Sequence, residues 1–345
     1  MGGLKYRLIR AAFDALSLPG VTGLLRRASR CRGVIFTLHR VLPEPPAAFS
    51  PNAILQVTPD FLDYAITRVR ALGLDIVDLD EALRRLGETT PGRPFAVFTF
   101  DDGYRDNRVH ALPILQRHRC PFTLYLPTAL VDGEGEIWWQ ALEDIIAREP
   151  VVTLTAGGID EHFDTATVEA KQAAFDIIYW RMRKMPESER VKLIRTFAAF
   201  HGMDLARHCR SLIMDWREIA EFAADPLCTI GAHTVRHYEL AKLPEEEASL
   251  EMGRSRDIIA ERLGRRPEHL SFPLGGPLSA GPREFAAARA LGFRSAVTTR
   301  PGGLYADADL HALPRVSLNG LFQARRYVDV FATGAVFSTL GRLGG

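Results

Sequence analysis

The sequence predicts an α/β fold built from parallel β/α units, and two observations support this prediction. Short apolar segments alternate with segments of helical periodicity up to about residue 127, which is the order that parallel sheets require. The run Phe95–Phe100 has the continuous hydrophobicity of a strand that is buried on both faces. With 345 residues, the chain is long enough for one large α/β barrel or for two ordinary domains.

The predicted elements divide the chain into an N-terminal segment 1–32, a main body 33–320 and a C-terminal segment 321–345. Between about 134 and 226 the chain is mostly helical in period, and we expect an insertion between two strands there. The predicted strands are 33–39, 74–79, 95–100, 121–127, 228–233, 269–273, 293–298 and 312–318. Helices are expected at 59–72, 106–119, 138–148, 166–184, 187–200, 216–224, 245–263 and 283–291.

Composition excludes several classes of protein. Hydrophobic residues make up 47% of the chain and charged residues 25%, as in globular proteins. The net charge of +1 gives no electrostatic reason to expect nucleic-acid binding. The cysteines are scattered without a Cys-x-x-Cys pair, which favours a reducing compartment and predicts cytoplasmic localisation: Cys31, Cys120, Cys209 and Cys228.

The N-terminal segment 1–32 is basic and has apolar residues at helical spacing. It does not predict an export signal, because Asp14 and Pro19 interrupt the apolar part. Two interpretations stay open. The segment forms an amphipathic helix that rests on the anionic inner face of a membrane, or it packs on the body with a solvated basic face.

Two adjacent carboxylates, Asp101 and Asp102, follow the strand 95–100 and precede Gly103. Such neighbours repel each other unless a cation lies between them. The alternative is an ordinary Asp-Gly turn without function. The sequence therefore marks this strand end as a candidate site.

Two histidines, His233 and His237, follow another short apolar strand. On a helical turn, residues four apart present their side chains on the same side, and we expect that arrangement here. One carboxylate and two imidazoles, with coordination positions left over, make a catalytic metal site.

The two motifs together, Thr-Phe-Asp-Asp-Gly at 99–103 and His-Thr-x-x-His at 233–237, resemble the polysaccharide deacetylase family, carbohydrate esterase family four. The resemblance covers roughly 33–320 apart from the helical insertion. It implies a distorted (β/α) barrel with about seven parallel strands. It also implies metal-dependent removal of an N-acetyl or other N-acyl group from an amino sugar in a glycan or lipid-linked saccharide.

Carried over residue by residue, the resemblance makes Asp101 the general base and Asp102, His233 and His237 the metal ligands. The expected metal is zinc, with cobalt or nickel as alternatives. The chemistry of these residue types agrees, because three protein ligands leave a position for water and for the substrate carbonyl. A carboxylate that does not bind the metal can accept the proton of that water.

The third motif departs from the family pattern. The matching stretch is Ser271-Phe272-Pro273-Leu274-Gly275, which lacks the usual arginine and has Leu274 at the aromatic position. The backbone N–H at Leu274 can still serve as an oxyanion donor. Arg315 is the candidate to replace the arginine by orienting Asp101, and a surface salt bridge is the alternative role for this side chain.

The general acid is not clear, because the family's leucine-x-histidine pattern is missing. His39, at the end of the first strand, is one candidate for the acid or a substrate contact, and His311 is the other. Tyr104, Pro273 and Leu274 are predicted substrate contacts. Trp138 and Trp139 either stack on sugar rings or anchor the inserted helices.

Three functions are compatible with these motifs: an amino-sugar N-deacetylase, a metal-dependent hydrolase of another small amide, and a non-catalytic glycan-binding relative. The complete set of motif residues argues against the third.

Overall fold

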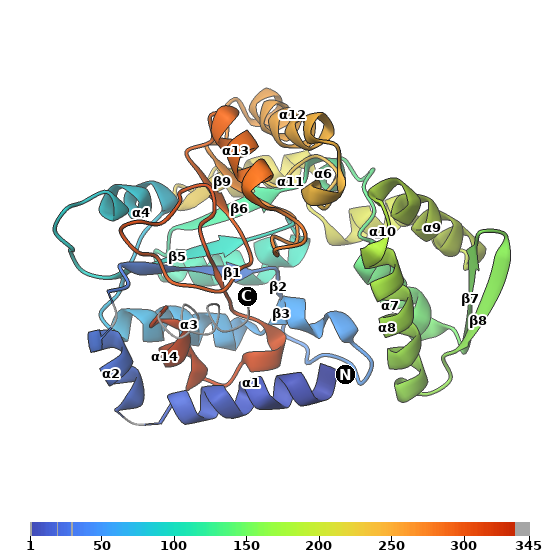
Figure 1. The fold of residues 1–345 in the computed structure, drawn as a ribbon, viewed down its shortest axis with the longest axis horizontal. Helices are drawn as coiled ribbons and strands as arrows, with labels where there is room; N and C mark the ends of the chain where they lie inside the picture. Colours follow the sequence, from blue (N-terminus) through green and yellow to red (C-terminus); the bar gives the residue numbers. More distant parts are fainter. Residues whose placement is uncertain (1, 19, 29, 335–345) are drawn as a thin grey trace.

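The computed structural model describes residues 2–18, 20–28 and 30–334, and its centre is one parallel sheet (Figure 1). Within these residues the strands follow the order β11-β10-β9-β6-β5-β1-β12, and β4 pairs with the start of β5. All of these pairs are parallel, which confirms the predicted fold of about seven parallel strands. The strands are β1 (Gly33–Leu38), β4 (Asp75–Ile76), β5 (Phe95–Phe100), β6 (Phe122–Leu126), β9 (Cys228–Ala232), β10 (His269–Ser271), β11 (Ser295–Val297) and β12 (Val316–Ser317).

The sheet curls without closing, and the chain crosses the gap between its two edge strands. After β11 the segment 310–313 runs beside that strand, where the Leu313 N–H donates to the Ala296 carbonyl at 3.0 Å. The chain then joins β1 as β12. Arg315 lies on this crossing segment, immediately before β12, so the crossing brings it back to the centre of the sheet.

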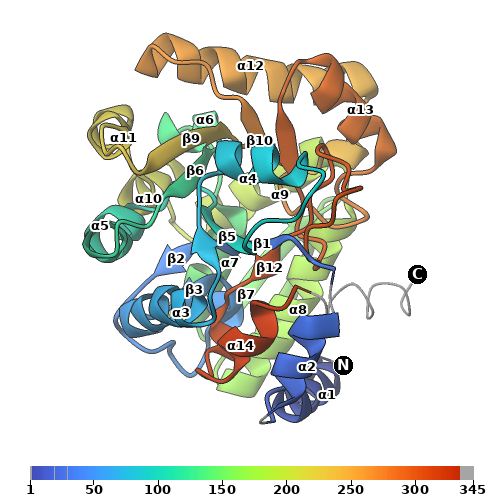
Figure 2. The same ribbon diagram turned by 90° about the vertical axis from the view of Figure 1, so that its left-hand side faces the viewer.

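Helices cover the outside of the curled sheet (Figure 2). They are α3 (Pro59–Ala71), α4 (Leu79–Leu86), α5 (Leu112–Arg117), α6 (Thr128–Val131), α11 (Trp216–Ala223), α12 (Glu245–Leu263) and α13 (Pro282–Ala290). Local chemistry sets several of their ends. The Thr58 hydroxyl accepts a hydrogen bond from the Phe61 N–H at the start of α3, and α12 ends at Gly264, whose φ is 71°.

The predicted helix 106–119 is divided in the structure. A π-helical turn, Asn107–Ala111, precedes α5, and Pro113 lies in the first turn of α5. A proline has no N–H to donate, so it is tolerated in a first turn and not in a helix interior. The short β2 (Arg40–Val41) and β3 (Gln56–Val57) pair with each other in the loop after β1, and 3-10 turns occupy Pro51–Leu55, Leu240–Lys242 and Gly320–Phe322.

The segment from about 134 to 226 lies beside the carboxyl ends of the strands (Figure 1). It contains α7 (Trp138–Arg148), α8 (Val168–Lys184), α9 (Glu187–Phe200) and α10 (Leu205–Leu212) before α11. It also contains an antiparallel hairpin of β7 (Val151–Ala156) and β8 (Ile159–Asp164), which the sequence analysis did not predict. The turn of this hairpin is Gly157-Gly158, with φ values of 61° and 80°, and such a pair is a typical hairpin signal.

Successive side chains along each strand point to opposite faces of the sheet, so the buried side chains form two clusters, one on each face. Ile35, Val97, Tyr125 and Val297 belong to one buried cluster, on the inner face of the curl. Because side chains two apart in a strand share a face, Thr99 and Asp101 project into the same interior as Val97. The other face packs against the helices through larger residues, among them Phe36, Phe98, Phe100 and Phe122.

The N-terminal helix α1 (Gly2–Leu16) lies against α14 (Tyr327–Phe331) and the turn before it, and α2 (Val21–Ala28) follows α1 in the chain (Figure 1). Phe13 is buried, with its ring 5.1 Å from that of Phe322 and 5.2 Å from that of Phe331. Asp14 accepts a hydrogen bond from the Tyr327 hydroxyl at 2.6 Å. One face of α1 therefore packs on the body.

Other apolar side chains of these two helices face solvent: Leu8 is 64% exposed and Leu24 is 69% exposed. Of the predicted C-terminal segment 321–345, residues 335–345 lie outside the described residues. Among the helices that the structure describes, none combines the length and hydropathy needed to span a membrane.

We predict that Phe13→Ala lowers the free energy of unfolding by about 3–5 kcal/mol, because truncating a buried aromatic ring leaves a cavity. Leu8→Ala on the same helix is the matched control, and we expect it to change that free energy by less than about 0.5 kcal/mol. Urea unfolding followed by circular dichroism measures both. Equal effects of the two substitutions would contradict the packing of α1 through Phe13.

Candidate active site

The adjacent aspartates project in different directions because the backbone turns between them. The Asp101 N–H still donates to the Leu38 carbonyl, at 3.0 Å, as part of the β1–β5 ladder. Asp102 and Gly103 both have a φ of 75°, which is uncommon for a residue other than glycine. This left-handed turn lets the first carboxylate stay inside the curled sheet while the second faces the loop after β9.

The Asp101 carboxylate forms a buried, bidentate ion pair with Arg315. The guanidinium donates to both carboxylate oxygens, at 2.8 and 2.7 Å, and its side chain is fully buried. The remaining donors of Arg315 reach Thr99 Oγ1 at 3.1 Å, Ser271 Oγ at 3.0 Å and the Thr298 carbonyl at 2.9 Å. The surface salt bridge considered for Arg315 is therefore excluded.

This environment keeps Asp101 ionised. Burial by itself opposes ionisation, but the Arg315 guanidinium holds the pKa of the Asp101 carboxyl well below its usual value. Burial also acts against ionisation of Asp102, but the neighbouring His237 nevertheless lowers the pKa of this carboxyl.

The two histidines do not lie on a helical turn, so that part of the sequence analysis is wrong. β9 ends at Ala232, and residues 233–237 form a loop with no helical hydrogen bonds. The loop is bent by left-handed residues, Thr234 with a φ of 65° and His237 with a φ of 56°. The Thr234 hydroxyl accepts a hydrogen bond from the His237 N–H at 3.1 Å.

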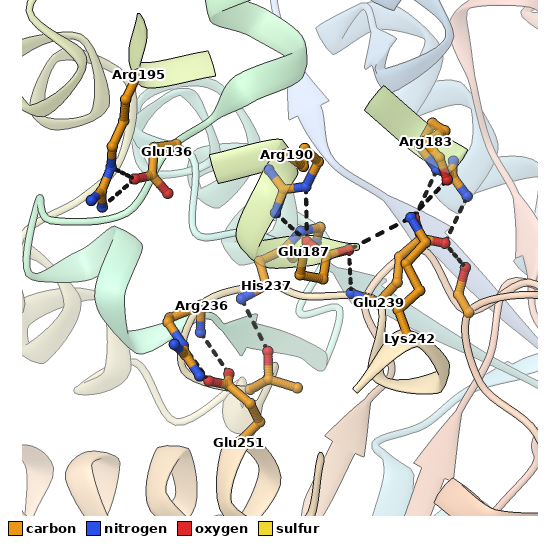
Figure 3. Close-up of polar contacts among 12 residues, drawn as sticks. Glu136, Arg183, Glu187, Arg190, Arg195, Arg236, His237, Glu239, Lys242 and Glu251 are labelled. Carbon is orange, nitrogen blue, oxygen red and sulfur yellow. Dashed lines mark hydrogen bonds and ion pairs between the residues drawn. The ribbon is translucent and has the colours of Figure 1, made fainter. Parts of the chain in front are cut away.

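A buried carboxylate from α12 holds the middle of this loop (Figure 3). Glu251 Oε2 accepts hydrogen bonds from the N–H groups of Val235 and Arg236, at 3.0 and 2.8 Å, and Oε1 accepts from Arg236 Nε at 2.6 Å. Glu251 is only 4% exposed. These bonds satisfy loop N–H groups that have no partner in the sheet, and they bring both imidazoles to one side of the loop.

The resulting group of Asp102, His233 and His237 could hold a metal ion. One ligand atom from each lies within 4.8 Å of the others, and all three residues are buried. Asp102 Oδ1 is 3.6 Å from His233 Nε2 and 3.3 Å from His237 Nε2. Among the described residues, this buried oxygen has no hydrogen-bond partner of good geometry. An orphaned buried carboxylate oxygen facing two imidazole nitrogens fits a divalent cation.

The His233 ring has the orientation and protonation that a metal ligand needs. Its Nδ1 lies 2.6 Å from the Ser271 carbonyl. A carbonyl can only accept, so Nδ1 carries the proton and Nε2 presents its lone pair to Asp102. Burial lowers the pKa of His233 to about 4, so the ring is neutral at neutral pH.

His39, Tyr104, Pro273 and Leu274 also lie at the carboxyl ends of the strands. His39 directly follows β1, and its carbonyl accepts a hydrogen bond from Asn107 Nδ2 at 2.7 Å. Tyr104 is fully buried, and its hydroxyl accepts a hydrogen bond from Trp139 Nε1 at 3.0 Å. Pro273 is buried, and the half-buried Leu274 has a φ of 60°. No described residue accepts a hydrogen bond from the Leu274 N–H.

The structure does not bring His311 to this cluster. Its Nε2 contacts the Phe293 carbonyl at 2.8 Å, before the start of β11 and so at the opposite end of the strands. The two tryptophans belong to α7 and are both buried. Trp138 stacks on Tyr179 of α8, with centroids 5.1 Å apart, and the ring of Trp139 lies 5.0 Å from that of His237.

Several residues that shape the site were missed by the sequence analysis. Thr234 and Ser271 lie within the quoted motifs, and their short polar side chains in otherwise constrained loops could have marked them. Glu251 has a weaker signal, because a glutamate in a helix is usually exposed and only the fold shows that this one is buried. The sequence predicts that Trp139 either stacks on a sugar ring or anchors the inserted helices. In the structure its ring packs beside that of His237.

The fold is similar to that of several solved deacetylases. The chain is 17% identical to a structure described as the Streptococcus pyogenes deacetylase PplD in complex with acetate, with a TM-score of 0.54, covering 83% of this chain and 92% of that one. It is 19% identical to IcaB from Ammonifex degensii, with a TM-score of 0.54, covering 87% of this chain and 97% of that one. A de-N-acetylase from Aggregatibacter actinomycetemcomitans, 13% identical, gives a TM-score of 0.54 and covers 87% of this chain and 99% of that one.

At such identities these likenesses establish the fold. No curated protein matches the chain in sequence. Residues 88–296, more than half of the chain and including both motifs, match the family model described as Polysaccharide deacetylase. The chain therefore belongs to the polysaccharide deacetylase family and is a hydrolase of the type that cleaves non-peptide carbon–nitrogen amide bonds.

Proposed function

We propose that this enzyme removes the N-acetyl, or another N-acyl, group from an amino sugar in a glycan or lipid-linked saccharide. One observation carries the proposal: of two adjacent buried aspartates, one is neutralised by Arg315 and the other faces two histidines. This is the division between a proton acceptor and a metal ligand that metal-assisted amide hydrolysis needs. The acetate complex and the de-N-acetylase among the similar structures support the choice of an acyl group on nitrogen.

In this proposal Asp102, His233 and His237 hold a divalent cation, most simply zinc, with cobalt or nickel as alternatives. When bound, such a cation supplies Lewis acidity, which acidifies a water molecule and polarises the amide carbonyl. Asp101 accepts the proton of the attacking water. Because the pKa of Asp101 is low, this carboxylate is ionised at neutral pH and can accept a proton.

Arg315 acts as a positioning residue for Asp101. Its two parallel hydrogen bonds fix the carboxylate in one plane, and its contacts to Ser271 and Thr298 tie that plane to β10 and β11. The arginine missing from the third motif is thus replaced by one from the segment before β12.

The Leu274 N–H is the proposed donor to the oxyanion of the tetrahedral intermediate. It has no acceptor among the described residues, and the left-handed φ of 60° at Leu274 sets its direction. His39 is the proposed general acid for the departing amine, because this histidine lies outside the ligand set and directly follows β1, at the carboxyl ends of the strands.

We further propose a cytoplasmic protein that makes peripheral contact with the inner membrane face through α1 and α2. The support is the basic segment 1–32 together with Leu8 and Leu24, whose side chains are mostly exposed. Exposed leucines among basic residues suit an anionic lipid surface.

The experiment that tests the activity is an acetate-release screen over N-acetylated amino-sugar oligomers, with zinc, cobalt or nickel supplied. Turnover of small amides but not of amino sugars would instead favour a hydrolase of another amide. Bound metal without turnover on any amide would favour a non-catalytic glycan-binding protein.

We predict that Asp101→Asn keeps the metal and lowers kcat by about 10²–10⁴-fold, the usual cost of losing a general base. Asp102→Asn should instead weaken metal binding, because a neutral amide oxygen is a poorer ligand than a carboxylate. Elemental analysis and acetate release, measured on the same samples, separate the two effects. Near-native turnover of Asp101→Asn with metal bound would contradict the assignment of the base.

We predict that Arg315→Met lowers the free energy of unfolding of the metal-free protein by about 3–5 kcal/mol, because it leaves the buried Asp101 charge without a partner. Arg289→Met, which removes an exposed partner of Asp309, is the control and should have little effect. The ion pair lowers the pKa of Asp101 in the folded state, so its stabilisation is present above the ordinary value of 3.8 and is lost as the pH falls below it. The difference between wild type and Arg315→Met should therefore shrink in acid; a difference that grows there would contradict this account.

For the membrane contact, we predict that Leu8→Ser combined with Leu24→Ser reduces binding to phosphatidylserine-containing vesicles by at least about tenfold, since each buried leucine contributes about 1.5–3 kcal/mol. Binding by the wild type should weaken with added salt. The control is Leu278→Ser, at a leucine that is 83% exposed on another part of the molecule. Equal vesicle sedimentation of wild type, the double variant and Leu278→Ser would refute the membrane contact. The double variant should turn over a soluble substrate as wild type does.

A further inference from the structure

We propose that the ion pair between Arg183 and Glu239 positions His237, so that the helical insertion is a working part of the metal site. This inference rests on the proposed function, in which His237 is a metal ligand. It assigns a role to two residues that are not themselves ligands, one from α8 in the insertion and one from the loop after β9.

The two histidines are held in different ways. The ring of His233 is fixed by the hydrogen bond from its Nδ1 to the Ser271 carbonyl. The Nδ1 of His237 is buried, and no described residue forms a hydrogen bond with it. A metal-bound histidine is normally oriented by a hydrogen bond from its second nitrogen. The position of His237 must therefore depend on its backbone and on packing against Trp139.

That backbone is strained. His237 has a φ of 56°, a conformation that persists only where surrounding contacts over-determine it. Upstream, Thr234 and Glu251 hold the loop. Downstream, the first strong anchor is Glu239, two residues after His237 and only 2% exposed.

The Glu239 carboxylate is the meeting point of three segments (Figure 3). Arg183 donates to both of its oxygens, each at 3.0 Å. Lys242 Nζ lies 2.7 Å from Oε1, and the Ser279 hydroxyl donates to Oε2 at 2.7 Å. Ser279 belongs to the loop that carries Pro273 and Leu274, so this one carboxylate joins the insertion, the histidine loop and the third-motif loop.

The insertion also holds the backbone of the histidine loop. Glu187, in the first turn of α9, accepts a hydrogen bond from the Glu239 N–H at 3.3 Å and is itself paired with the buried Arg190. Lys242 donates to the Arg183 carbonyl at 2.7 Å. Both the side chain and the N–H of Glu239 are thus fixed from the insertion, and the strained His237 lies between this anchor and Thr234.

The test compares two arginines of α8. Arg183→Met removes the pair with Glu239, whereas Arg181→Met removes a pair with Glu161 of β8 that stays inside the insertion. The measurement is the Kd for zinc, by competition with a chromophoric chelator. We expect Arg183→Met to bind zinc about 10–100-fold more weakly than wild type, the usual cost of losing a partner that orients a ligand. Arg181→Met should bind zinc as wild type does.

Three further variants separate the loss of this ion pair from a folding defect. Glu239→Gln keeps the shape of the side chain and should weaken zinc binding in the same range. The double variant Arg183→Met/Glu239→Gln should bind zinc no more weakly than the weaker of the two single variants, because the Arg183–Glu239 pair is already lost in each of them. Arg183→Lys keeps the charge without the bidentate geometry and should fall between wild type and Arg183→Met.

Circular dichroism confirms that each variant is folded. The inference is overturned if folded Arg183→Met and Glu239→Gln bind zinc as tightly as wild type, or if Arg181→Met weakens binding equally, because the effect would then be one of insertion stability. The proposed function would be overturned instead if the wild-type protein bound no zinc, or if Asp102→Asn bound zinc as tightly as wild type. That result is distinct from the others.

Discussion

The buried ion pair between Asp101 and Arg315 is the interaction on which the proposed chemistry depends. Without it, the buried Asp101 carboxylate would have no cationic partner, and it would compete with Asp102 for any cation in the site. The guanidinium occupies both oxygens of Asp101 and leaves Asp102 to face the histidines. The same contact depends on the course of the chain after β11. Arg315 lies on the segment that crosses the open side of the sheet between β11 and β12.

The backbone of the site is strained, and the surrounding polar contacts stabilise it. Of the five described residues other than glycine with a positive φ, four lie at the site: Asp102, Thr234, His237 and Leu274. Residues in such conformations cost free energy and cluster where function requires them. Here the cost is offset by buried charged groups that satisfy the loops, namely Glu251 for the histidine loop and Glu239 for its far end. The insertion, which at first resembles an addition to the barrel, supplies part of this support.

The sequence was sufficient for the parallel sheet, for most helices and for the identity of the Asp-His-His group, because periodicity and motif spacing are local properties. It was sufficient to select Arg315 as a candidate but not to choose between its two roles, since that choice depends on the crossing of the sheet. The hairpin Val151–Asp164 had a usable signal in Gly157-Gly158 that was outweighed by the helical segments around it. The helical turn expected at His233–His237 was wrong because spacing alone cannot distinguish a helix from a loop bent by Thr234 and His237. The pair of Arg183 and Glu239 could not be predicted, because its members are 56 residues apart in the chain.

The most direct test of the central claim, that Arg315 reserves Asp101 for proton transfer while Asp102 binds the cation, is a crystal structure of the zinc-loaded protein with anomalous data at the zinc edge. We predict one peak within bonding distance of an Asp102 carboxylate oxygen, His233 Nε2 and His237 Nε2, with Asp101 still paired to Arg315 and not coordinated. A peak coordinated by Asp101, or one located away from both histidines, would contradict it.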